Sequence, residues 1–568
     1  MGSTTPLSLP LEATYSSFEE LLSAAQTHAK AAGFAFVTGK TKKKNGRIIK
    51  QLNCKRGGVY RQYRPDSTED SRKRQRSTQR INCPVAIKAR ERPDGTWELC
   101  HIARLETETN SHNHGPDNPA AFTEHRRLNE EQTSIVHTHH YAGISPSRTV
   151  TVLKMQFPTI DINHRDIYNI VAELSRAKRC GMPPPEALIV QLELEKAEGH
   201  IFFEWERDLA GHISFLFVAD QRSIRYLSKH FDMLLLDCTY KSNKFDMPLL
   251  DIIGVDSMGC TFSVAFCFLD SEIEENYSKA IQHLVTILPA GQWPSVIATD
   301  CELALISAID RQFPAIRTKR VICFWHICKN LMVNCKSKFE TEERWEDFER
   351  YFRDVVYAKT PEEYEDRVVE FKAEFYFNDG NPLPFIQGQP QNIHIIRSLE
   401  QDAVKYALGG WLIPYHQQIV HAWVDQSFHG GTTTTSRLEG AHAVLKRWIG
   451  GPSKNLTNVW SSIKLALDSQ HNELSIRHAQ EITRTPISLS SVLFYGVIGK
   501  ISHHGLYHAH KQLKYAQNEA DHRHDDSYST ICTGTFSSSM GLPCWHRIKA
   551  KLAQNQGIST SKSTLEQY

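Results

Sequence analysis

Three acidic residues have positions that suit metal-dependent phosphodiester chemistry. Asp237 ends the apolar run 233–236, and Asp300 ends a second apolar run at 295–299. Carboxylates that lie close together repel each other, whereas two bridged Mg²⁺ ions could let them activate an attacking oxygen and stabilise a leaving oxygen. Glu439 is the candidate third acid, in the first turn of a helix that hydroxyls upstream of it would cap. Each acid also has an ordinary interpretation, because Asp often ends strands and a Glu in a first turn favours the helix dipole.

Two cysteines and two histidines make a second candidate site. Cys54 and Cys83 lie upstream of the pair His112 and His114. Two thiolates and two imidazoles form a tetrahedral zinc set. Their spacing is too long for a small finger whose helix enters the DNA groove, and it favours a sheet that is stapled at one edge by Zn²⁺. The alternative is two buried cysteines and two surface histidines.

The charge is segregated along the chain. Residues 40–104 contain nineteen Lys or Arg against six Asp or Glu, so this segment carries +13 and the remainder −11 of a total of +2. The densest basic run lies between two strand-like stretches and is interpreted as a phosphate-contacting loop, with a solvated loop or a nuclear-import signal as the alternatives. The residues of this run predicted to bind DNA are Arg72, Lys73, Arg74 and Arg76.

The elements that must position the three acids follow one another from about residue 212 in the order βββαβαβ, and then a helix. This order is similar to that of the ribonuclease H-like fold, in which the first and fourth strands of the series lie side by side. Asp237 and Asp300 would then converge although they are far apart in sequence. The aromatic residues at helical spacing in 339–424 are expected to form a helical core rather than to stack on DNA.

Two further groups are weaker candidates. Cys323 and His326 are either a metal-binding or DNA-positioning pair or a packed junction between a strand and a helix. In residues 121–180, short helices around the turn 142–144 form either a second helix-turn-helix reader or a helical connector.

Several of these motifs resemble known families. Residues 15–118, with the two cysteines and the terminal His-x-His, resemble the far-red-impaired-response type of DNA-binding domain, a relative of the WRKY and GCM zinc domains. Asp237 in Leu-Leu-Leu-Asp-Cys-Thr-Tyr, Asp300 in Ala-Thr-Asp, Glu439 in Ser-Arg-Leu-Glu-Gly-Ala-His and the Cys-x-x-His look like the signature of Mutator-like element (MULE) transposases, over about residues 200–480. The first resemblance implies reading of the DNA major groove by the sheet, and the second implies a DDE-type transposase with two Mg²⁺ or Mn²⁺ ions.

The C-terminal part resembles the SWIM zinc module, with a departure from its pattern. Cys532, Cys544 and His546 match three ligand positions, but Gly534 stands where the second cysteine belongs. Zinc binding there needs a fourth ligand, for which His522 and His524 are the candidates. A metal-free remnant that packs beside the core is the alternative.

The length of 568 residues predicts several domains. We expect an α/β multidomain chain, with a ribonuclease H-like core that carries an all-helical insertion and follows a zinc-stapled DNA-binding domain. The N-terminus shows no secretory signal, no run is long enough to cross a membrane, and an odd number of cysteines favours a reducing compartment, so a soluble intracellular protein is expected. As a DNA-binding protein it is expected in the nucleus. The expected domains are the zinc domain at 15–118, the helical segment at 121–185, the core at 200–338 and 429–480, the insertion at 339–428, the SWIM-like region at 481–553 and a disordered tail at 554–568.

The function expected from these features is cut-and-paste transposition of DNA. The zinc domain would bind terminal inverted repeats of double-stranded DNA, and the core would cleave the strands and join them to target DNA, in a homo-oligomer that pairs the two ends. The main alternative is a domesticated transposase that regulates transcription without nuclease activity. A ribonuclease H-like hydrolase acting on RNA or hybrid duplexes is a third possibility.

Overall fold

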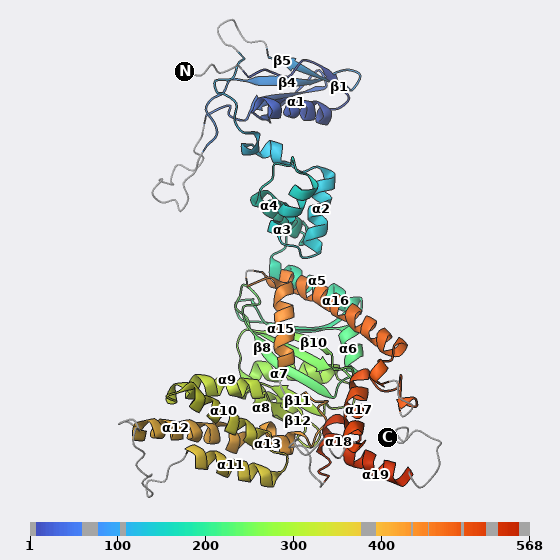
Figure 1. Ribbon diagram of the computed structural model, residues 1–568. Coiled ribbons are helices and arrows are strands. Elements are labelled where there is room, and N and C mark those ends of the chain that lie inside the picture. The colour runs from blue at the N-terminus through green and yellow to red at the C-terminus, as the bar shows by residue number, and fades with distance from the viewer. Residues whose placement is uncertain are drawn as a thin grey trace. The chain divides into compact units, whose positions relative to one another are not determined.

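The computed structural model describes residues 7–59, 78–102, 110–375, 393–432, 436–452, 454–489, 494–517 and 532–555. The chain divides into two compact units, residues 1–181 and 182–568, each with a sheet of its own (Figure 1). The mixed α/β composition predicted from the sequence is confirmed. The basic run at 72–76 and the two candidate fourth ligands, His522 and His524, lie outside the described residues. None of the described helices combines the length and apolar character needed to cross a membrane.

The first unit contains a five-stranded antiparallel sheet and one long helix. The strand order is β1-β5-β4-β3-β2. The strands are β1 (Thr14–Tyr15), β2 (Phe36–Lys44), β3 (Arg47–Cys54), β4 (Ala86–Glu91) and β5 (Trp97–His101), and the helix is α1 (Phe18–Ala32). The strand-like stretches expected on either side of the basic run are confirmed as β3 and β4. β2 was not predicted, because its Lys-rich half has no apolar alternation.

Helix α1 begins and ends where the sequence supplies caps. The Ser17 hydroxyl accepts the Glu20 amide N–H at 3.1 Å, and Gly33 ends the helix in the left-handed region at φ 80°. The helix buries Leu21, Ala25 and Ala29 against the sheet. This core includes Cys54 and Cys83, so it fixes the end of the sheet where the two cysteine ligands lie.

Three helices follow in the same unit. They are α2 (Glu130–Tyr141), α3 (Pro146–Gln156) and α4 (His164–Lys178), as the sequence predicted. They share a small core of their own around Val136, Leu153 and Ile167. The short 3-10 helix Thr123–Arg126, which precedes α2, contacts the sheet region through the pair of Lys55 with Glu124, at 2.6 Å.

The second unit is built on a seven-stranded mixed sheet in the order β12-β11-β8-β9-β10-β7-β6. Its strands are β6 (Ile201–Arg207), β7 (Ile213–Asp220), β8 (Met233–Thr239), β9 (Leu249–Val255), β10 (Thr261–Leu269), β11 (Val296–Thr299) and β12 (Lys319–Ile322). β11 pairs in parallel with β8 and with β12, and the other neighbours are antiparallel. The predicted βββαβαβ order and the pairing of its first and fourth strands are confirmed. β6 and β7, which extend the sheet beyond β10, were not predicted.

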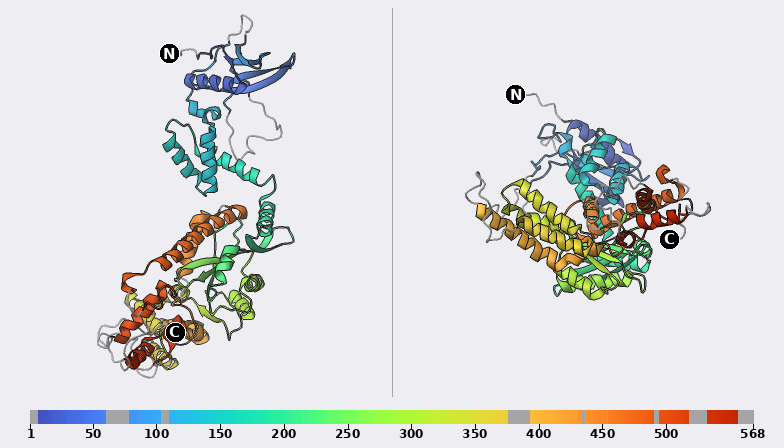
Figure 2. Two further views of the ribbon diagram at one scale, coloured as in Figure 1. Left: turned by 90° about the vertical axis from the view of Figure 1, so that its right-hand side faces the viewer. Right: turned by 60° about the horizontal axis from the view of Figure 1, so that its bottom comes forward.

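Helices cover both faces of this sheet (Figures 1 and 2). One face packs on α7 (Glu274–Ile287) and α8 (Leu303–Gln312), and the other on α5 (Pro184–Ala197), α15 (Ser436–Ile449) and α16 (Leu456–Thr483). The short helix α6 (Gln221–Leu227) connects β7 to β8. Successive side chains of β7 and β10 alternate between the two cores, which is why these strands are apolar on both sides.

A helical region separates the last strand from α15. Its helices are α9 (Phe324–Cys335), α10 (Glu342–Val356), α11 (Pro361–Phe375), α12 (Ile393–Ala407), α13 (Ile413–Ile419) and α14 (His421–Val424), and a π-helical turn, Leu408–Leu412, joins α12 to α13. Its aromatic residues pack together, with Phe348 and Phe371 fully buried. The prediction that these aromatics form a core is confirmed.

The C-terminal part is also helical. It contains α17 (His503–Gln517), α18 (Thr535–Met540) and α19 (Trp545–Asn555). The backbone N–H groups of His429 and Gly430 donate to the Ser539 carbonyl at 3.0 and 2.9 Å, so α18 contacts the segment that precedes α15. The tail predicted to be disordered lies outside the described residues from 556 onward.

Candidate functional site

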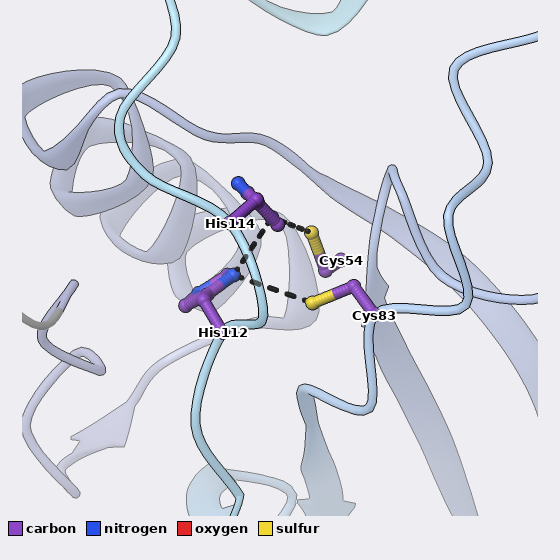
Figure 3. A group of neighbouring side chains, drawn as sticks. All are labelled: Cys54, Cys83, His112 and His114. Atoms are coloured by element: carbon purple, nitrogen blue, oxygen red, sulfur yellow. Dashed lines mark hydrogen bonds between the residues drawn. The ribbon is translucent and has the colours of Figure 1, made fainter.

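The four predicted zinc ligands of the first unit lie together at one edge of its sheet (Figure 3). Cys54 ends β3, Cys83 lies ahead of β4, and both thiols are buried. Cys54 Sγ lies 3.4 Å from His114 Nε2, and Cys83 Sγ lies 3.5 Å from His112 Nδ1. The two ring nitrogens are 3.1 Å apart. A tetrahedral zinc site has ligand separations of about 3.3–3.8 Å. The two sulfur–nitrogen distances lie in this range and the nitrogen–nitrogen distance is slightly shorter, so these residues fit a Zn²⁺ ion after a small adjustment.

The surroundings hold these ligands in place. The Asn110 side chain exchanges two hydrogen bonds of 3.1 Å with the Ala86 backbone and so ties the histidine segment to β4. His114 Nδ1 lies 2.8 Å from the Gly115 carbonyl, which orients the ring with Nε2 toward the cysteines. A hydrogen bond from the Cys54 thiol lowers the pKa of Cys83, which favours the thiolate that binds metal.

The two candidate catalytic aspartates lie on neighbouring strands of the second unit. Thr299 of β11 pairs with Leu236 of β8. The residues that come next on the two strands, Asp300 and Asp237, therefore lie side by side. Asp237 is 8% exposed, and its pKa is raised to about 8, chiefly by burial and then by the charge of Asp300. Burial also raises the pKa of Asp300. The sheet therefore brings a buried and a partly buried carboxyl together, as the sequence predicted, in surroundings that disfavour two negative charges.

Glu439 comes to the same region from α15. The preceding residue, Leu438, is fully buried against strands β8, β9, β11 and β12 and anchors the helix there. The charge of Glu439 contributes to the raised pKa of Asp237. Among the described residues, however, the three carboxylates are not one of the groups whose ligand atoms all lie within 4.8 Å of one another.

The two members of the Cys-x-x-His motif have different surroundings. Cys323 is fully buried, and its N–H donates to the Thr299 carbonyl at 2.9 Å at the junction of β12 and α9. His326 Nε2 lies 3.8 Å from Glu439 Oε1, and burial lowers the pKa of His326. The cysteine thus has the surroundings of a packed junction, and the histidine those of a group that faces a candidate catalytic acid.

Two polar residues beside Asp237 had no assigned role in the sequence analysis. Asp251 of β9 pairs directly with Asp237 and is 1% exposed. His442 of α15 lies between them, with Nδ1 3.9 Å from Asp237 Oδ2 and Nε2 3.6 Å from Asp251 Oδ2. A charged residue inside the apolar run 249–255 was the signal that could have identified Asp251.

The three SWIM-like ligands lie together in the C-terminal part. The Cys532 and Cys544 sulfur atoms are 3.6 Å apart, and His546 completes a group within 4.8 Å. Cys544 is buried, whereas Cys532 is exposed. Three soft ligands fit a Zn²⁺ ion that takes a fourth ligand from elsewhere or from water.

A part of each unit matches the model of a known protein family. Residues 25–116 match the family model of the FAR1 DNA-binding domain, and residues 233–330 match that of the MULE transposase domain. The chain carries a FAR1-type DNA-binding domain and a MULE transposase domain. The FAR1-type match contains all four ligands of the first unit, and the MULE match contains Asp237, Asp300 and the Cys-x-x-His motif.

Individual relatives match parts of the chain at low identity. Protein FAR1-RELATED SEQUENCE 5 of Arabidopsis thaliana is 23% identical over 322 residues, which are 55% of this chain and 39% of that protein. Protein FAR1-RELATED SEQUENCE 4 of the same plant is 20% identical over 434 residues, 74% of this chain and 55% of that protein. A segment of the PKS-NRPS hybrid synthetase cheA of Chaetomium globosum is 28% identical over 356 residues, 59% of this chain but 7% of that protein. The chain thus matches less than two thirds of the length of each of these relatives.

Proposed function

We propose that the protein is a cut-and-paste DNA transposase of the DDE type. The observation that carries the proposal is the adjacency of Asp237 and Asp300 at the ends of the parallel strands β8 and β11, next to the helix that bears Glu439. The order β12-β11-β8-β9-β10 supports a ribonuclease H-like core, in which the acids of the two parallel strands meet. The MULE transposase match over both aspartates supports the same assignment.

The residues of this site fit divalent cations. Asp237, Asp300 and Glu439 would hold two Mg²⁺ or Mn²⁺ ions, which supply activation of the attacking oxygen and neutralisation of the leaving oxygen. The raised pKa values of both aspartates reflect buried charge that such cations compensate. His326 would orient the Glu439 carboxylate. Water would cut the strand at the element end, and the freed 3′-hydroxyl would attack target DNA without a covalent enzyme intermediate.

The FAR1-type domain would select the DNA. Cys54, Cys83, His112 and His114 would hold Zn²⁺ and so fix the sheet that contacts the terminal inverted repeats. The exposed lysines of β2 and the basic run at 72–76 would contact phosphates. We further propose that the active form is a nuclear homo-oligomer that pairs the two element ends, with residues 121–185 as a connector.

A domesticated regulator that binds DNA without cutting it is the second candidate. The observation in its favour is the different geometry of the two sites. The zinc ligands of the first unit already lie within 4.8 Å of one another, whereas among the described residues the three carboxylates do not form such a group. Metal-free carboxylates that repel each other would give the same geometry in an active enzyme.

An excision assay separates the two candidates. A reporter interrupted by the element, with its own terminal repeats, is introduced into cells together with the wild-type protein or with Asp300→Ala. A transposase restores the reporter, and Asp300→Ala does not. A regulator binds the repeats and changes transcription equally in both forms without excision, which would overturn the proposal.

A further inference from the structure

A buried polar trio lies beneath α15. Asp251 and Asp237 are cross-strand partners on β9 and β8, so both side chains lie on the same face of the sheet. His442 of α15 packs on that face and is 8% exposed. Its Nε2 lies 3.6 Å from Asp251 Oδ2, and its Nδ1 lies 3.9 Å from Asp237 Oδ2. One imidazole therefore bridges a candidate metal ligand and a second, deeper carboxyl.

The demands of the fold do not explain this trio. Asp251 is flanked by the fully buried Leu250 and Ile252, and its Oδ1 has no hydrogen-bond partner. His442 Nε2 also lacks a hydrogen-bond partner. Burying such groups costs several kcal/mol, and a well-packed apolar pair of similar volume is often as stable or more stable.

Asp256, at the end of the same hairpin, shows what a structural carboxyl looks like in this sheet. It is 6% exposed and accepts hydrogen bonds from the Tyr226 hydroxyl and from the amides of Met258 and Cys260, at 2.7–2.9 Å. Asp256 fixes a turn, and its polar contacts explain its burial. Asp251 has no comparable set of contacts and faces Asp237 instead.

We propose that Asp251 and His442 are positioning residues that hold the Asp237 carboxylate in its metal-binding orientation. This inference rests on the proposed function. Asp251 orients the imidazole through Nε2 of His442, and the ring presents Nδ1 to Asp237. An imidazolium with one N–H toward each carboxylate gives all three groups a partner, as does a neutral ring beside one protonated carboxyl.

The same contact also sets the position of Glu439. Glu439 and His442 are three residues apart on α15 and therefore lie on the same side of the helix. A contact between His442 and the two aspartates fixes the rotation of α15 about its axis, and with it the approach of Glu439 to Asp237. Asp251 and His442 would thus influence the positions of all three acids of the proposed metal site.

Titration of Mn²⁺ into the full-length, zinc-loaded protein tests this inference without requiring cleavage. Isothermal titration calorimetry is compared for wild type, Asp251→Asn, His442→Ala and His442→Gln. Loss of a group that orients a metal ligand typically weakens metal binding about 10–100-fold. We expect a rise of this size in the Mn²⁺ dissociation constant for Asp251→Asn and His442→Ala. We expect partial recovery in His442→Gln, whose amide keeps an N–H donor.

Asp256→Asn is the matched control. It removes a buried carboxylate from the same hairpin and should lower the melting temperature while leaving the Mn²⁺ dissociation constant unchanged. Wild-type Mn²⁺ affinity in both Asp251→Asn and His442→Ala would overturn the inference. If Asp251→Asn does not fold, the affinity of His442→Ala alone decides between the two results. If Asp237→Asn binds Mn²⁺ as wild type does, the proposed metal site itself is wrong, a result that the positioning variants cannot mimic.

Discussion

At the scale of single residues, the two candidate metal sites differ in how closely their ligands can approach one another before a metal ion binds. Histidine and cysteine side chains can approach to 3.1–3.5 Å, and those of the first unit do. Carboxylates repel, so the acids of the second unit lie close enough to raise the pKa of Asp237 without forming a group within 4.8 Å among the described residues. The zinc ligands can therefore be recognised from their mutual distances, whereas the carboxylates are recognised from strand pairing and burial.

Replacement of one zinc ligand should abolish DNA binding by the first unit. Cys54→Ala leaves three ligands for an ion that also ties β3 to the histidine segment, so the sheet edge should lose its order. We expect about one fewer zinc per chain by atomic absorption and loss of specific binding in a gel-shift assay. Cys100→Ala, in β5 of the same sheet and outside the ligand group, is the control and should retain both. Undiminished binding by Cys54→Ala would contradict the zinc assignment.

The raised pKa of Asp237 predicts a pH-dependent stability of the metal-free protein. The group has a pKa of about 3.9 when unfolded and about 8 when folded. The folded state therefore binds this proton more tightly, and its contribution to stability is highest below pH 4 and falls as the pH rises toward 8. Asp237→Asn should raise the free energy of unfolding by about 2–4 kcal/mol at pH 8 and change it little at pH 4.

Melting temperatures measured across this pH range without added divalent ions check that prediction. Mg²⁺ at pH 8 should then raise the melting temperature of the wild type more than that of Asp237→Asn, because it binds the ionised carboxylate. A variant that is less stable than the wild type at pH 8 would contradict the assigned environment of Asp237.

At the scale of elements, pairing across the central hairpin positions the site. Gly254 of β9 lies opposite Phe262 of β10, and a Cβ on this glycine would come within 2.3 Å of the phenyl ring. The ring thus occupies the space above the glycine and helps to hold the register between β9 and β10. On its other side β9 pairs with β8, where Asp251 lies opposite Asp237.

Gly254→Ala should therefore destabilise the second unit by about 1–3 kcal/mol through overpacking. Thermal unfolding followed by circular dichroism measures the effect. Gly440→Ala is the matched control, because it adds the same methyl group to α15 where no atom lies within 4 Å, and helix propensity predicts a small stabilisation. Equal behaviour of the two variants would show that the ring does not pack on Gly254.

Sequence reasoning predicted the elements with a strong pattern and missed those without one. The apolar runs that end at Asp237 and Asp300 predicted β8 and β11. Their pairing was expected from the similarity of the element order to that of the ribonuclease H-like fold. The strand β2 was missed because four lysines occupy its solvent-facing half. Asp251 and His442 gained a role only from the structure, since their contact depends on cross-strand register and on helix packing, which periodicity does not fix.

At the scale of the whole molecule, the net charge of +2 conceals a segregated distribution. The basic excess belongs to residues 40–104 and the acidic excess to the remainder, which contains the candidate carboxylate site. A polyanion is thus attracted to one unit of a nearly neutral chain, and affinity for DNA should depend steeply on salt.

Removal of Lys42, Lys43 and Lys44 should flatten that dependence. These exposed residues of β2 are proposed phosphate contacts, and each contact contributes roughly 0.9 to the slope of the logarithm of affinity against the logarithm of salt concentration. Fluorescence anisotropy with a labelled duplex measures this slope. Alanine at Lys359, Lys372 and Lys405 of the second unit removes the same charge and should leave the slope unchanged. Equal slopes in the two triple variants would argue against β2 as the contacting strand.

Metal-dependent strand cleavage by the purified full-length protein tests the central claim most directly. The substrate is a labelled duplex that contains an element end and its flanking DNA, incubated with Mg²⁺ or Mn²⁺ and then resolved on a denaturing gel. We predict a nick at the element end for the wild type. Asp237→Ala, Asp300→Ala and Glu439→Ala should produce no nick while binding the duplex with wild-type affinity. Cleavage that persists in these variants, or a wild-type protein that binds the duplex but never cuts it, would contradict the assignment of these three acids as a catalytic site.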